Sequence, residues 1–260
     1  MLKVIGLGPP AEKTKLCDIK IRENVPLDLF SETYNDNPNV TLPASETARP
    51  LSAVFGRDSV AITLLFQVHA PDAVDILDCT HNKGVMWKDL PYKPVTMDID
   101  PQWGTDIVGD FRDMVGVQDK SFDVIVFDPP HLPVAAASAN SSGIWRSRYG
   151  LTDDAGQGRD GDNVSDMFAP FLAEAKRVLK PDGVVFAKIV DIVHNHRYQW
   201  QHVDLVLAAR MVGMTPCDML VKIDPCGGNL KSGRWQKVHH FKRSHCYWMV
   251  IRNSTKCEHR

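Results

Sequence analysis

The sequence predicts an α/β fold in which helices flank a doubly wound, parallel sheet. From residue 46 onward, short apolar runs alternate with stretches of helical period. Such alternation is typical of βαβ units, whose strands pair in parallel. The chain has 260 residues, of which 43% are hydrophobic, enough for one α/β domain with elaborations. We therefore expect this domain over residues 46–260, preceded by an N-terminal arm over residues 1–45 that is rich in Pro, Asn and charge.

The elements are expected in a regular order along the domain. Residues 49–68 predict a helix that ends near Pro71, and its apolar run 60–68 is too short for a membrane span. Apolar runs bounded by turn residues predict strands at 73–77, 94–99, 106–110, 122–127 and 184–190. Helical patterns lie at 85–90, 165–179 and 201–212, with Lys180-Pro181-Asp182-Gly183 closing the second of these helices. Residues 219–223 and 246–252 predict a closing pair of strands, the last one antiparallel.

Charge, the start of the chain and the cysteines argue against a globally basic nucleic-acid-binding protein, a secreted protein and a disulfide-rich protein. The net charge of −2 and the pI near 6.5 give no global nucleic-acid signature, so a basic surface must be local. The start of the chain runs into Gly8-Pro9-Pro10 and is too short for a signal peptide. The cysteines are widely spaced and form no C-x-x-C pair, which predicts reduced thiols in a soluble, cytoplasmic protein. They are Cys17, Cys79, Cys217, Cys226, Cys246 and Cys257.

The most informative segment is Asp128-Pro129-Pro130-His131, which directly follows the apolar run 122–127. The first proline moves Asp128 out of the helical region, and neither proline has an N–H to donate. The turn therefore presents a fixed cluster of acceptors, the carboxylate and main-chain carbonyls, followed by a flat ring. Such a cluster suits a planar amino group like that of a nucleobase, although a plain strand-ending turn is the alternative for these four residues alone.

Acidic residues also end the preceding strands. Asp78 opens the loop Asp78-Cys79-Thr80-His81-Asn82-Lys83-Gly84, and Asp98 and Asp110 end the next two strands. In doubly wound sheets ligands bind at the carboxyl ends of the strands, and an acid on the second strand binds ribose hydroxyls. The loop lacks G-x-G-x-x-G and so is no dinucleotide fingerprint. Asn82 is a residue type that tolerates a positive φ, so a tight turn is still expected there.

The order of these motifs resembles that of S-adenosylmethionine-dependent amino-methyltransferases of the D-P-P-[YFW] type, the DNA N6-adenine and N4-cytosine methyltransferases, in particular solitary phage or bacterial enzymes. The resemblance covers roughly residues 45–252 and is sharpest from Asp78 to His131. It implies a Rossmann-like methyltransferase sheet with S-adenosylmethionine as cofactor. The methyl acceptor is then an exocyclic amino group, with adenine N6 in DNA the first choice. Asn82 replaces the first glycine of the family's D-x-x-x-G-x-G loop, and His131 replaces its aromatic residue.

The resemblance also implies roles for individual residues. Asp128, Pro129, Pro130 and His131 would form the catalytic pocket, in which Asp128 and the Pro129 carbonyl accept the amino hydrogens of a base flipped out of its stack. His131 would stack on that base. The cofactor would contact the ribose-binding Asp98, the adenine-binding Asp110 and the following loops. The full cofactor set is Asp78, Thr80, Asn82, Gly84, Asp98, Asp110 and Phe111.

Two segments outside the alternation are candidates for contact with nucleic acid. The long loop 132–166 mixes aromatic and cationic residues, which suits stacking on bases and contact with phosphates, although an ordinary anchored loop is nearly as good an interpretation. The loop 224–245 carries cations in a stretch from residue 229 onward that has no acid, as phosphate binding favours. The candidates are Trp145, Arg146, Arg148, Tyr149, Lys231, Arg234, Lys237, Lys242 and Arg243.

Metal sites are not expected. The Cys and His residues between 226 and 246 match no standard zinc spacing. A zinc site of Asp98, Asp128 and His131 is conceivable, but the Pro-Pro turn favours base recognition.

Two other functions remain open. The first is an RNA methyltransferase acting on adenine N6 or guanine N2, for which exposed bases need little recognition machinery. The second is a catalytically silent, methyltransferase-like subunit that binds nucleic acid. We expect nucleic acid as the partner, DNA rather than RNA, expect no membrane, and leave a homodimer open.

Overall fold

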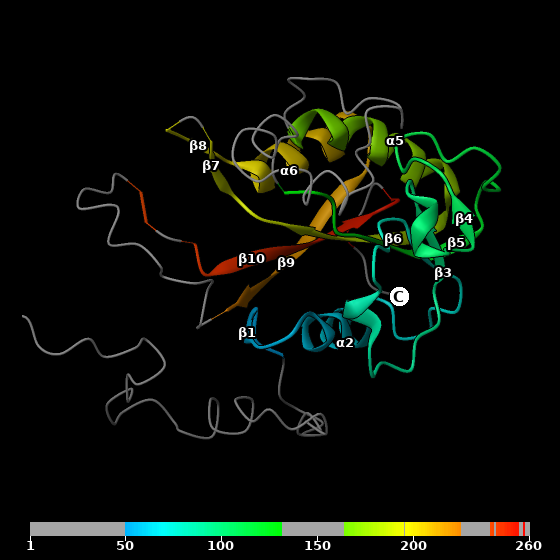
Figure 1. Ribbon diagram of the computed structural model, residues 1–260, viewed down its shortest axis with the longest axis horizontal. Coiled ribbons are helices and arrows are strands. Elements are labelled where there is room, and N and C mark those ends of the chain that lie inside the picture. The colour runs from blue at the N-terminus through cyan, green and yellow to red at the C-terminus, as the bar shows by residue number, and fades with distance from the viewer. Residues whose placement is uncertain are drawn as a thin grey trace, which may run out of the picture.

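The computed structural model describes residues 50–131, 164–194, 196–224, 240–241, 243–254 and 257. Its centre is an eight-stranded sheet of order β1-β9-β10-β6-β5-β2-β3-β4 (Figure 1). β10 (His245–Arg252) is antiparallel to both of its neighbours, and the other pairs are parallel. The predicted doubly wound α/β fold, a Rossmann-like and mostly parallel sheet with an antiparallel last strand, is confirmed.

The strands lie close to the predicted ranges. The run 122–127 forms β5 with the expected bounds, Phe122–Phe127, and the predicted closing pair is formed by β9 and β10. The remaining sheet strands are β1 (Ala53–Phe55), β2 (Ile76–Asp78), β3 (Val95–Asp98), β4 (Ile107–Val108), β6 (Leu179–Ile189) and β9 (Thr215–Ile223). A separate antiparallel hairpin joins β7 (Ile192–His194) to β8 (Arg197–Gln199).

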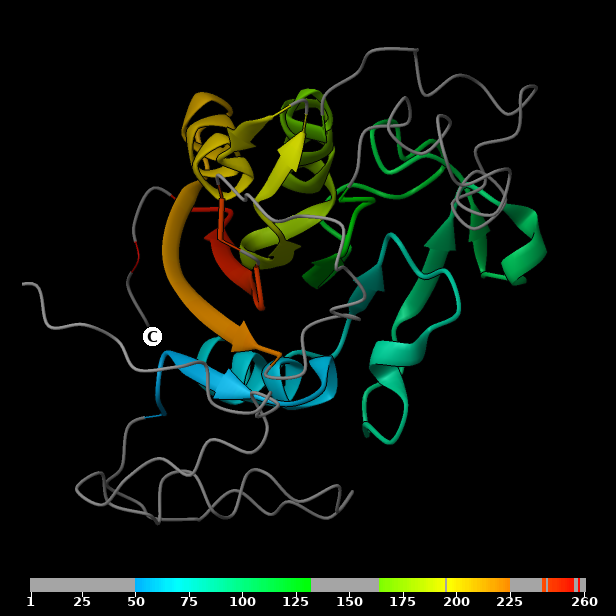
Figure 2. The same cartoon turned by 60° about the vertical axis from the view of Figure 1, so that its left-hand side comes forward.

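Helices cover both faces of this sheet. α5 (Phe168–Val178) and α6 (Gln201–Met211) lie on one face, and α2 (Asp58–His69) lies on the other (Figures 1 and 2). Each face has its own core, because alternate residues of a strand point to opposite sides. In β5, Ile125 and Phe127 join the core under α5 and α6, whereas Val124 and Val126 join the core under α2. Short 3-10 turns are η2 (Val85–Trp87), η3 (Pro101–Trp103) and η4 (Val164–Met167).

Three predicted elements were wrong in part. The short helix expected at 85–90 is only the 3-10 turn η2, which ends at Trp87. The helix expected at 49–68 begins only at Asp58, because Ala53–Phe55 form the edge strand β1 beside β9. Gly56, at φ +119°, separates the strand from the helix. Residues Lys180 to Gly183 lie within β6 rather than before it, since β6 starts at Leu179 opposite Phe122. The register then shifts, which is the sign of a bulge, and Asp182 in this segment has φ +63°.

The expectation of reduced thiols is also corrected. Cys217 at β9 and Cys257 near the C-terminus form a disulfide. Their separation of 40 residues in the sequence concealed the pair, since spacing alone does not determine which thiols meet. Cys79 and Cys246 are free and buried.

None of the helices among the described residues is long and apolar enough to cross a membrane. The arm 1–45, most of the loop 132–166, and most of the basic loop 224–245 lie outside the described residues.

The topology places a candidate ligand site at one edge of the sheet. From β2 the chain moves outward through β3 to β4, and it then returns to add β5 and β6 on the other side of β2. The strand order therefore reverses between β2 and β5. In open α/β sheets the carboxyl ends of the strands at such a reversal form the ligand site, and Asp78 and Asp128 lie there.

Candidate functional site

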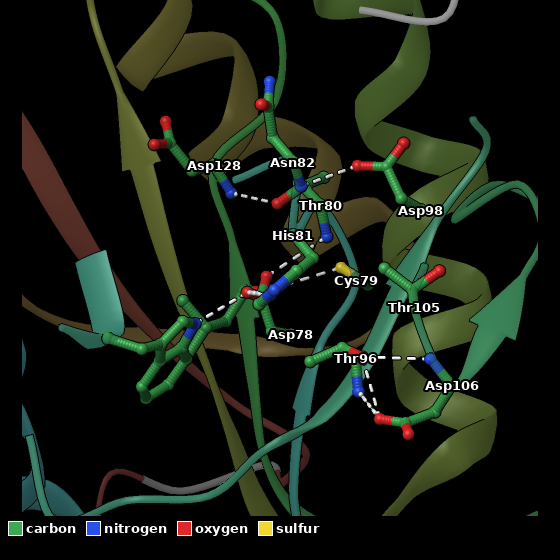
Figure 3. Close-up of polar contacts among 12 residues, drawn as sticks. Asp78, Cys79, Thr80, His81, Asn82, Thr96, Asp98, Thr105, Asp106 and Asp128 are labelled. Atoms are coloured by element: carbon green, nitrogen blue, oxygen red, sulfur yellow. Dashed lines mark hydrogen bonds and ion pairs between the residues drawn. The ribbon is translucent and has the colours of Figure 1, made fainter. Parts of the chain in front are cut away.

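The loop after β2 is organised by the carboxylate of Asp78, which is fully buried. Its Oδ1 accepts a hydrogen bond from the Thr80 N–H at 3.3 Å, and its Oδ2 accepts one from Trp87 Nε1 at 2.6 Å. His81 Nδ1 lies 2.8 Å from the same Oδ2 (Figure 3). This hydrogen bond raises the pKa of His81, against an opposing effect of burial. Asp78 thus uses its buried carboxylate to hold the loop and does not expose it at the surface.

Two residues with a left-handed backbone conformation shape the same loop. Asn82 has φ +49°, so the positive φ expected of it is confirmed. Gly84 has φ +61°, and a Cβ placed there would lie only 2.6 Å from Cε1 of the His81 ring. Gly84 is therefore required both by the backbone angle and by the close approach of His81.

Asp98, at the carboxyl end of β3, lies beside this turn. Its Oδ2 accepts from the Asn82 N–H at 2.7 Å and its Oδ1 from the Asp100 N–H at 3.0 Å (Figure 3). Burial raises the pKa of Asp98, and these two hydrogen bonds offset part of that effect. The neighbouring Asp100 instead caps η3, where it accepts from the Gln102 N–H. Asp98 is therefore the acid that connects the end of β3 to the loop after β2.

Asp110 and Phe111 have other neighbours. Asp110 forms a two-pronged ion pair with Arg112, in which Arg112 Nη2 lies 2.6 Å from Oδ2. The ring of Phe111 packs edge-on against Phe127 and Phe171, with centroids 5.1 and 6.0 Å away. Phe111 thus belongs to the core under α5, and a role as an adenine platform stays a prediction without a supporting contact.

Asp128 directly follows β5 and meets the first loop. Its backbone N–H donates to Thr80 Oγ1 at 2.8 Å, which joins the two strand ends across the topological reversal (Figure 3). Its Oδ1 lies 3.1 Å from His131 Nε2, and its Oδ2 lies 3.0 Å from Lys188 Nζ. The imidazole of His131 is therefore oriented by the carboxylate of its own motif. Pro129 is buried and Pro130 half-buried.

Lys188 is the site residue that the sequence prediction missed. It lies on β6, is 15% exposed, and bridges Asp128 to Asp58 at the start of α2, whose Oδ2 is 2.9 Å away. Lys222 on β9 pairs with the other oxygen of Asp58 at 3.1 Å. A lysine inside the apolar run 184–190 was the available signal, because a buried Lys needs an acidic partner.

These pairs determine the charge of Asp128. Burial alone would raise its pKa, but Lys188 and His131 outweigh burial and lower the pKa to about 2. For Lys188 the effects have the opposite sign. Burial lowers its pKa, and the nearby carboxylates of Asp128 and Asp58 raise it by more. Asp128 is thus an anion, and its neighbour Lys188 a cation, over the whole physiological range.

The described part of the chain contains no group of three His, Cys, Asp or Glu side chains placed to bind a metal ion. Of the residues predicted to bind nucleic acid, only Arg243 is described, and its guanidinium lies over the ring of Tyr198 with its carbon 5.5 Å from the ring centroid. The others lie outside the described residues: Trp145, Arg146, Arg148, Tyr149, Lys231, Arg234, Lys237 and Lys242.

A large cavity lies at the opposite edge of the sheet. Its volume is about 1070 Å³, and its lining includes Val68, Asp123 and Asp182. Asp123 and Asp182 lie near the amino ends of β5 and β6. The cavity therefore contacts none of the acids at the carboxyl ends of the strands, where this class of sheet binds its ligands.

Comparison with known proteins gives similar structures at low sequence identity. A methyltransferase of Burkholderia thailandensis, the 1,6-didemethyltoxoflavin N1-methyltransferase bound to S-adenosylhomocysteine, has a TM-score of 0.43 and 13% identity over 75% of this chain and 77% of its own. A candidate methyltransferase of Haloferax volcanii in complex with the activator Trm112 has a TM-score of 0.46 and 14% identity over 78% and 92%.

A candidate DNA modification methylase of Thermus thermophilus has a TM-score of 0.37 and 12% identity over 58% of this chain. The match spans only 54% of that methylase, about half of its length. No protein-family model matches the sequence. No curated protein matches it either. Values this low identify neither the reaction nor the substrate, which depend on the site itself.

Proposed function

We propose that this chain transfers a methyl group from S-adenosylmethionine to an exocyclic amino nitrogen of a nucleobase, with adenine N6 in DNA as the first target. The observation that carries the proposal is the hydrogen bond from the Asp128 N–H to Thr80 Oγ1. It holds the Asp-Pro-Pro turn against the loop after β2, at the topological reversal of the sheet. A nucleoside cofactor on that loop and an amino group at Asp128 would then be neighbours.

The residues at the carboxyl ends of β2 and β3 fit such a cofactor. Each oxygen of Asp98 accepts one backbone hydrogen bond, and an ionised carboxylate offers about four lone-pair sites. Asp98 can therefore still accept from both ribose hydroxyls. Gly84 leaves bare backbone at the turn, where a side chain would collide with His81. We assign Asp78 to positioning this loop, since its carboxylate is buried among protein donors.

When bound, S-adenosylmethionine supplies an electrophilic methyl group on its sulfonium. The chain must make the acceptor nitrogen nucleophilic, because the lone pair of an aromatic amino group is delocalised into the ring. Asp128 and the Pro129 carbonyl would accept hydrogen bonds from the two amino hydrogens, which favours a tetrahedral nitrogen with a free lone pair. When the nitrogen gains the methyl group, one of these two hydrogens would leave as a proton to solvent. The remaining rate gain comes from positioning the nitrogen by these two contacts.

Lys188 and His131 support this role of Asp128. A carboxyl group accepts on both oxygens without donating only when it is ionised, and the two partners hold the pKa of Asp128 at about 2. Each partner occupies one carboxylate oxygen, and each oxygen retains a second lone pair for the base. Because Lys188 also pairs with Asp58, it fixes the carboxylate in one orientation.

The target base must leave a duplex stack to reach this turn, at a cost of roughly a few kcal/mol. Stacking on a flat side chain offsets about 1–3 kcal/mol of that cost. His131 would provide this surface, although its imidazole covers a smaller area than the ring of Tyr, Phe or Trp. Its Nε2 is turned toward Asp128. An unpaired base avoids the cost of flipping, so we expect single-stranded DNA to be at least as good a substrate as duplex DNA.

The deciding experiment is methyl transfer from labelled S-adenosylmethionine to duplex DNA, single-stranded DNA and bulk RNA in parallel, with the product nucleoside identified by mass spectrometry. N6-methyladenine in DNA is the expected product. Label in RNA alone would redirect the proposal to an RNA amino-methyltransferase. Cofactor binding without transfer to any acceptor would indicate a silent binding subunit.

The variant Asp128→Ala tests the assigned chemistry. We expect methyl transfer to be lost, because the amino hydrogens lose their acceptor, while S-adenosylmethionine binding stays within a few-fold of wild type by isothermal titration. Retained methyl transfer, or loss of cofactor binding as well as transfer, would contradict the role given to Asp128.

A further inference from the structure

A small aromatic platform lies beside the candidate site, and of its three residues only Arg243 has been given a role above, as a candidate contact with nucleic acid. We define it as Tyr198, Trp200 and Arg243. Trp200 is a large apolar side chain with 58% exposure. Its ring lies next to that of Tyr198, with centroids 4.6 Å apart and the planes tilted by 51°. The Arg243 guanidinium lies over the other ring, Tyr198, at 5.5 Å. An exposed indole beside a cation is the pattern that suits a base with its phosphate.

The platform is anchored from below by a buried acid. Asp191 is 1% exposed, and its Oδ2 accepts from the Tyr198 hydroxyl at 3.1 Å. Its Oδ1 accepts from the His202 N–H and lies 2.7 Å from His202 Nδ1. The ring of His202 in turn lies against Tyr247 of β10, with centroids 4.4 Å apart. Because these contacts fix the rings before any ligand binds, a ligand loses less conformational entropy on binding there.

The platform is also coupled to the Asp-Pro-Pro-His turn. Gln201, the residue after Trp200, donates from Nε2 to the backbone carbonyl of His131 at 3.4 Å. β7 and β8 follow the carboxyl end of β6. Because β5 and β6 are parallel, this is the same edge of the sheet at which β5 ends and Asp128 follows. A strand whose target base entered the turn at His131 would therefore pass Trp200.

The charge of the platform favours an anion. Arg243 Nη1 is buried, and no described residue accepts a hydrogen bond from it. Arg243 as a whole is only half-buried, and a guanidinium beside an exposed indole suits a phosphate oxygen, because Arg–phosphate hydrogen bonds are charge-assisted. Arg197, at the tip of the β7–β8 hairpin, adds a second exposed cation.

We propose that the platform binds the nucleotide adjacent to the target on the same nucleic-acid strand. Its base stacks on Trp200, and its phosphate accepts from Arg243. The proposal rests on the function inferred above, because that function places the target base at Asp128. Stacking is tolerant of sequence, since every base has a π-face. The platform therefore holds the strand without selecting a recognition sequence.

The test compares two acceptors. The first is a short, fluorescein-labelled, single-stranded DNA that contains adenine, with a single-stranded RNA of the same sequence in a parallel arm. The second is free adenosine, which has no neighbouring nucleotide. Binding is measured by fluorescence anisotropy and methyl transfer by incorporated label, so that the two readouts are independent.

Trp200→Ala should raise the dissociation constant and the KM for the oligonucleotide about tenfold, the effect of losing one base–aromatic stack. We expect kcat on the oligonucleotide and the turnover of adenosine to stay unchanged. Trp200→Phe should restore most of the affinity. Arg243→Ala should weaken binding and lower the salt dependence by about one phosphate contact.

The matched control is Leu207→Ala, an apolar residue with 52% exposure on α6, which should bind and react as wild type. Methyl transfer by wild type with unchanged binding in Trp200→Ala and Arg243→Ala would overturn the platform while leaving the proposed function intact. Strand binding that depends on Trp200 without transfer to any acceptor would support the platform and overturn the proposed function. No binding of either strand by wild type would overturn the platform.

Discussion

At the scale of single residues, the charge chain from Lys222 through Asp58 and Lys188 to Asp128 governs the candidate site. Lys188 holds both acids, at 2.9 Å for Asp58 and 3.0 Å for Asp128, whereas Lys222 contacts only Asp58 of this pair of acids. Removal of one partner from a buried ion pair leaves an uncompensated charge. The two lysines therefore form a matched pair for experiment, because only one of them contacts the acid of the Asp-Pro-Pro turn.

We predict that Lys188→Met lowers the free energy of unfolding by about 3–5 kcal/mol at neutral pH, because it leaves Asp128 without its cation. Lys222→Met should cost less, since Asp58 keeps Lys188. Lys188→Arg should recover much of the loss. Urea denaturation measures all three variants. Equal losses in the two Met variants would show that Asp128 does not depend on Lys188.

At the scale of elements, the loop between β2 and η2 carries the most stringent geometry. Gly84 and Gly104 have nearly the same backbone angle, φ +61° and +62°. They differ in their surroundings, because an added Cβ at Gly84 meets His81, whereas one at Gly104 meets no heavy atom within 4 Å. Substitution at the two positions therefore separates the cost of the angle from the cost of the collision.

We predict that Gly104→Ala costs about 1–2 kcal/mol, the penalty of a left-handed conformation for a residue with a Cβ. Gly84→Ala should cost more, because His81 must also move away from Asp78, and it should weaken S-adenosylmethionine binding. Chemical denaturation and isothermal titration give the two values. Equal stability and equal cofactor affinity in both variants would mean that the His81 side chain moves away from the added Cβ at no measurable cost in free energy.

At the scale of the whole molecule, acid stability depends in part on Asp128. Its pKa is lowered in the folded protein from 3.8 to about 2, so folding favours the ionised form. The stabilisation is fully present above the unfolded pKa of 3.8 and is lost as the pH falls through about 2. A shift of this size corresponds to about 2 kcal/mol.

We therefore predict that the difference in free energy of unfolding between wild type and Asp128→Asn shrinks by about 2 kcal/mol as the pH falls from near neutral to about 2. The variant is needed because other carboxyls, among them Asp123 and Glu174, also have lowered pKa values and titrate in both proteins. Urea titrations across this range supply the measurement. A difference that does not change with pH would refute the prediction.

The alternation of apolar runs and helical periods was sufficient to predict the sheet, the bounds of β5, helix α6 and the closing pair β9 and β10. Local patterns suffice for these elements because a strand or a helix that buries one face shows this in the spacing of its own apolar residues. The same reasoning predicted a left-handed turn at Asn82, since backbone sterics are local.

The sequence by itself determined which chemical groups end the strands, because an acid after an apolar run stays at the strand end in any parallel sheet. Only the tertiary structure decided which of those acids are exposed to a ligand and which are satisfied internally. Lys188 meets Asp128 across 60 residues, Arg112 occupies Asp110, and Phe111 packs into the core. Contacts of this kind arise from the packing of distant segments. Their energies depend on burial and on the partner, neither of which a local pattern contains.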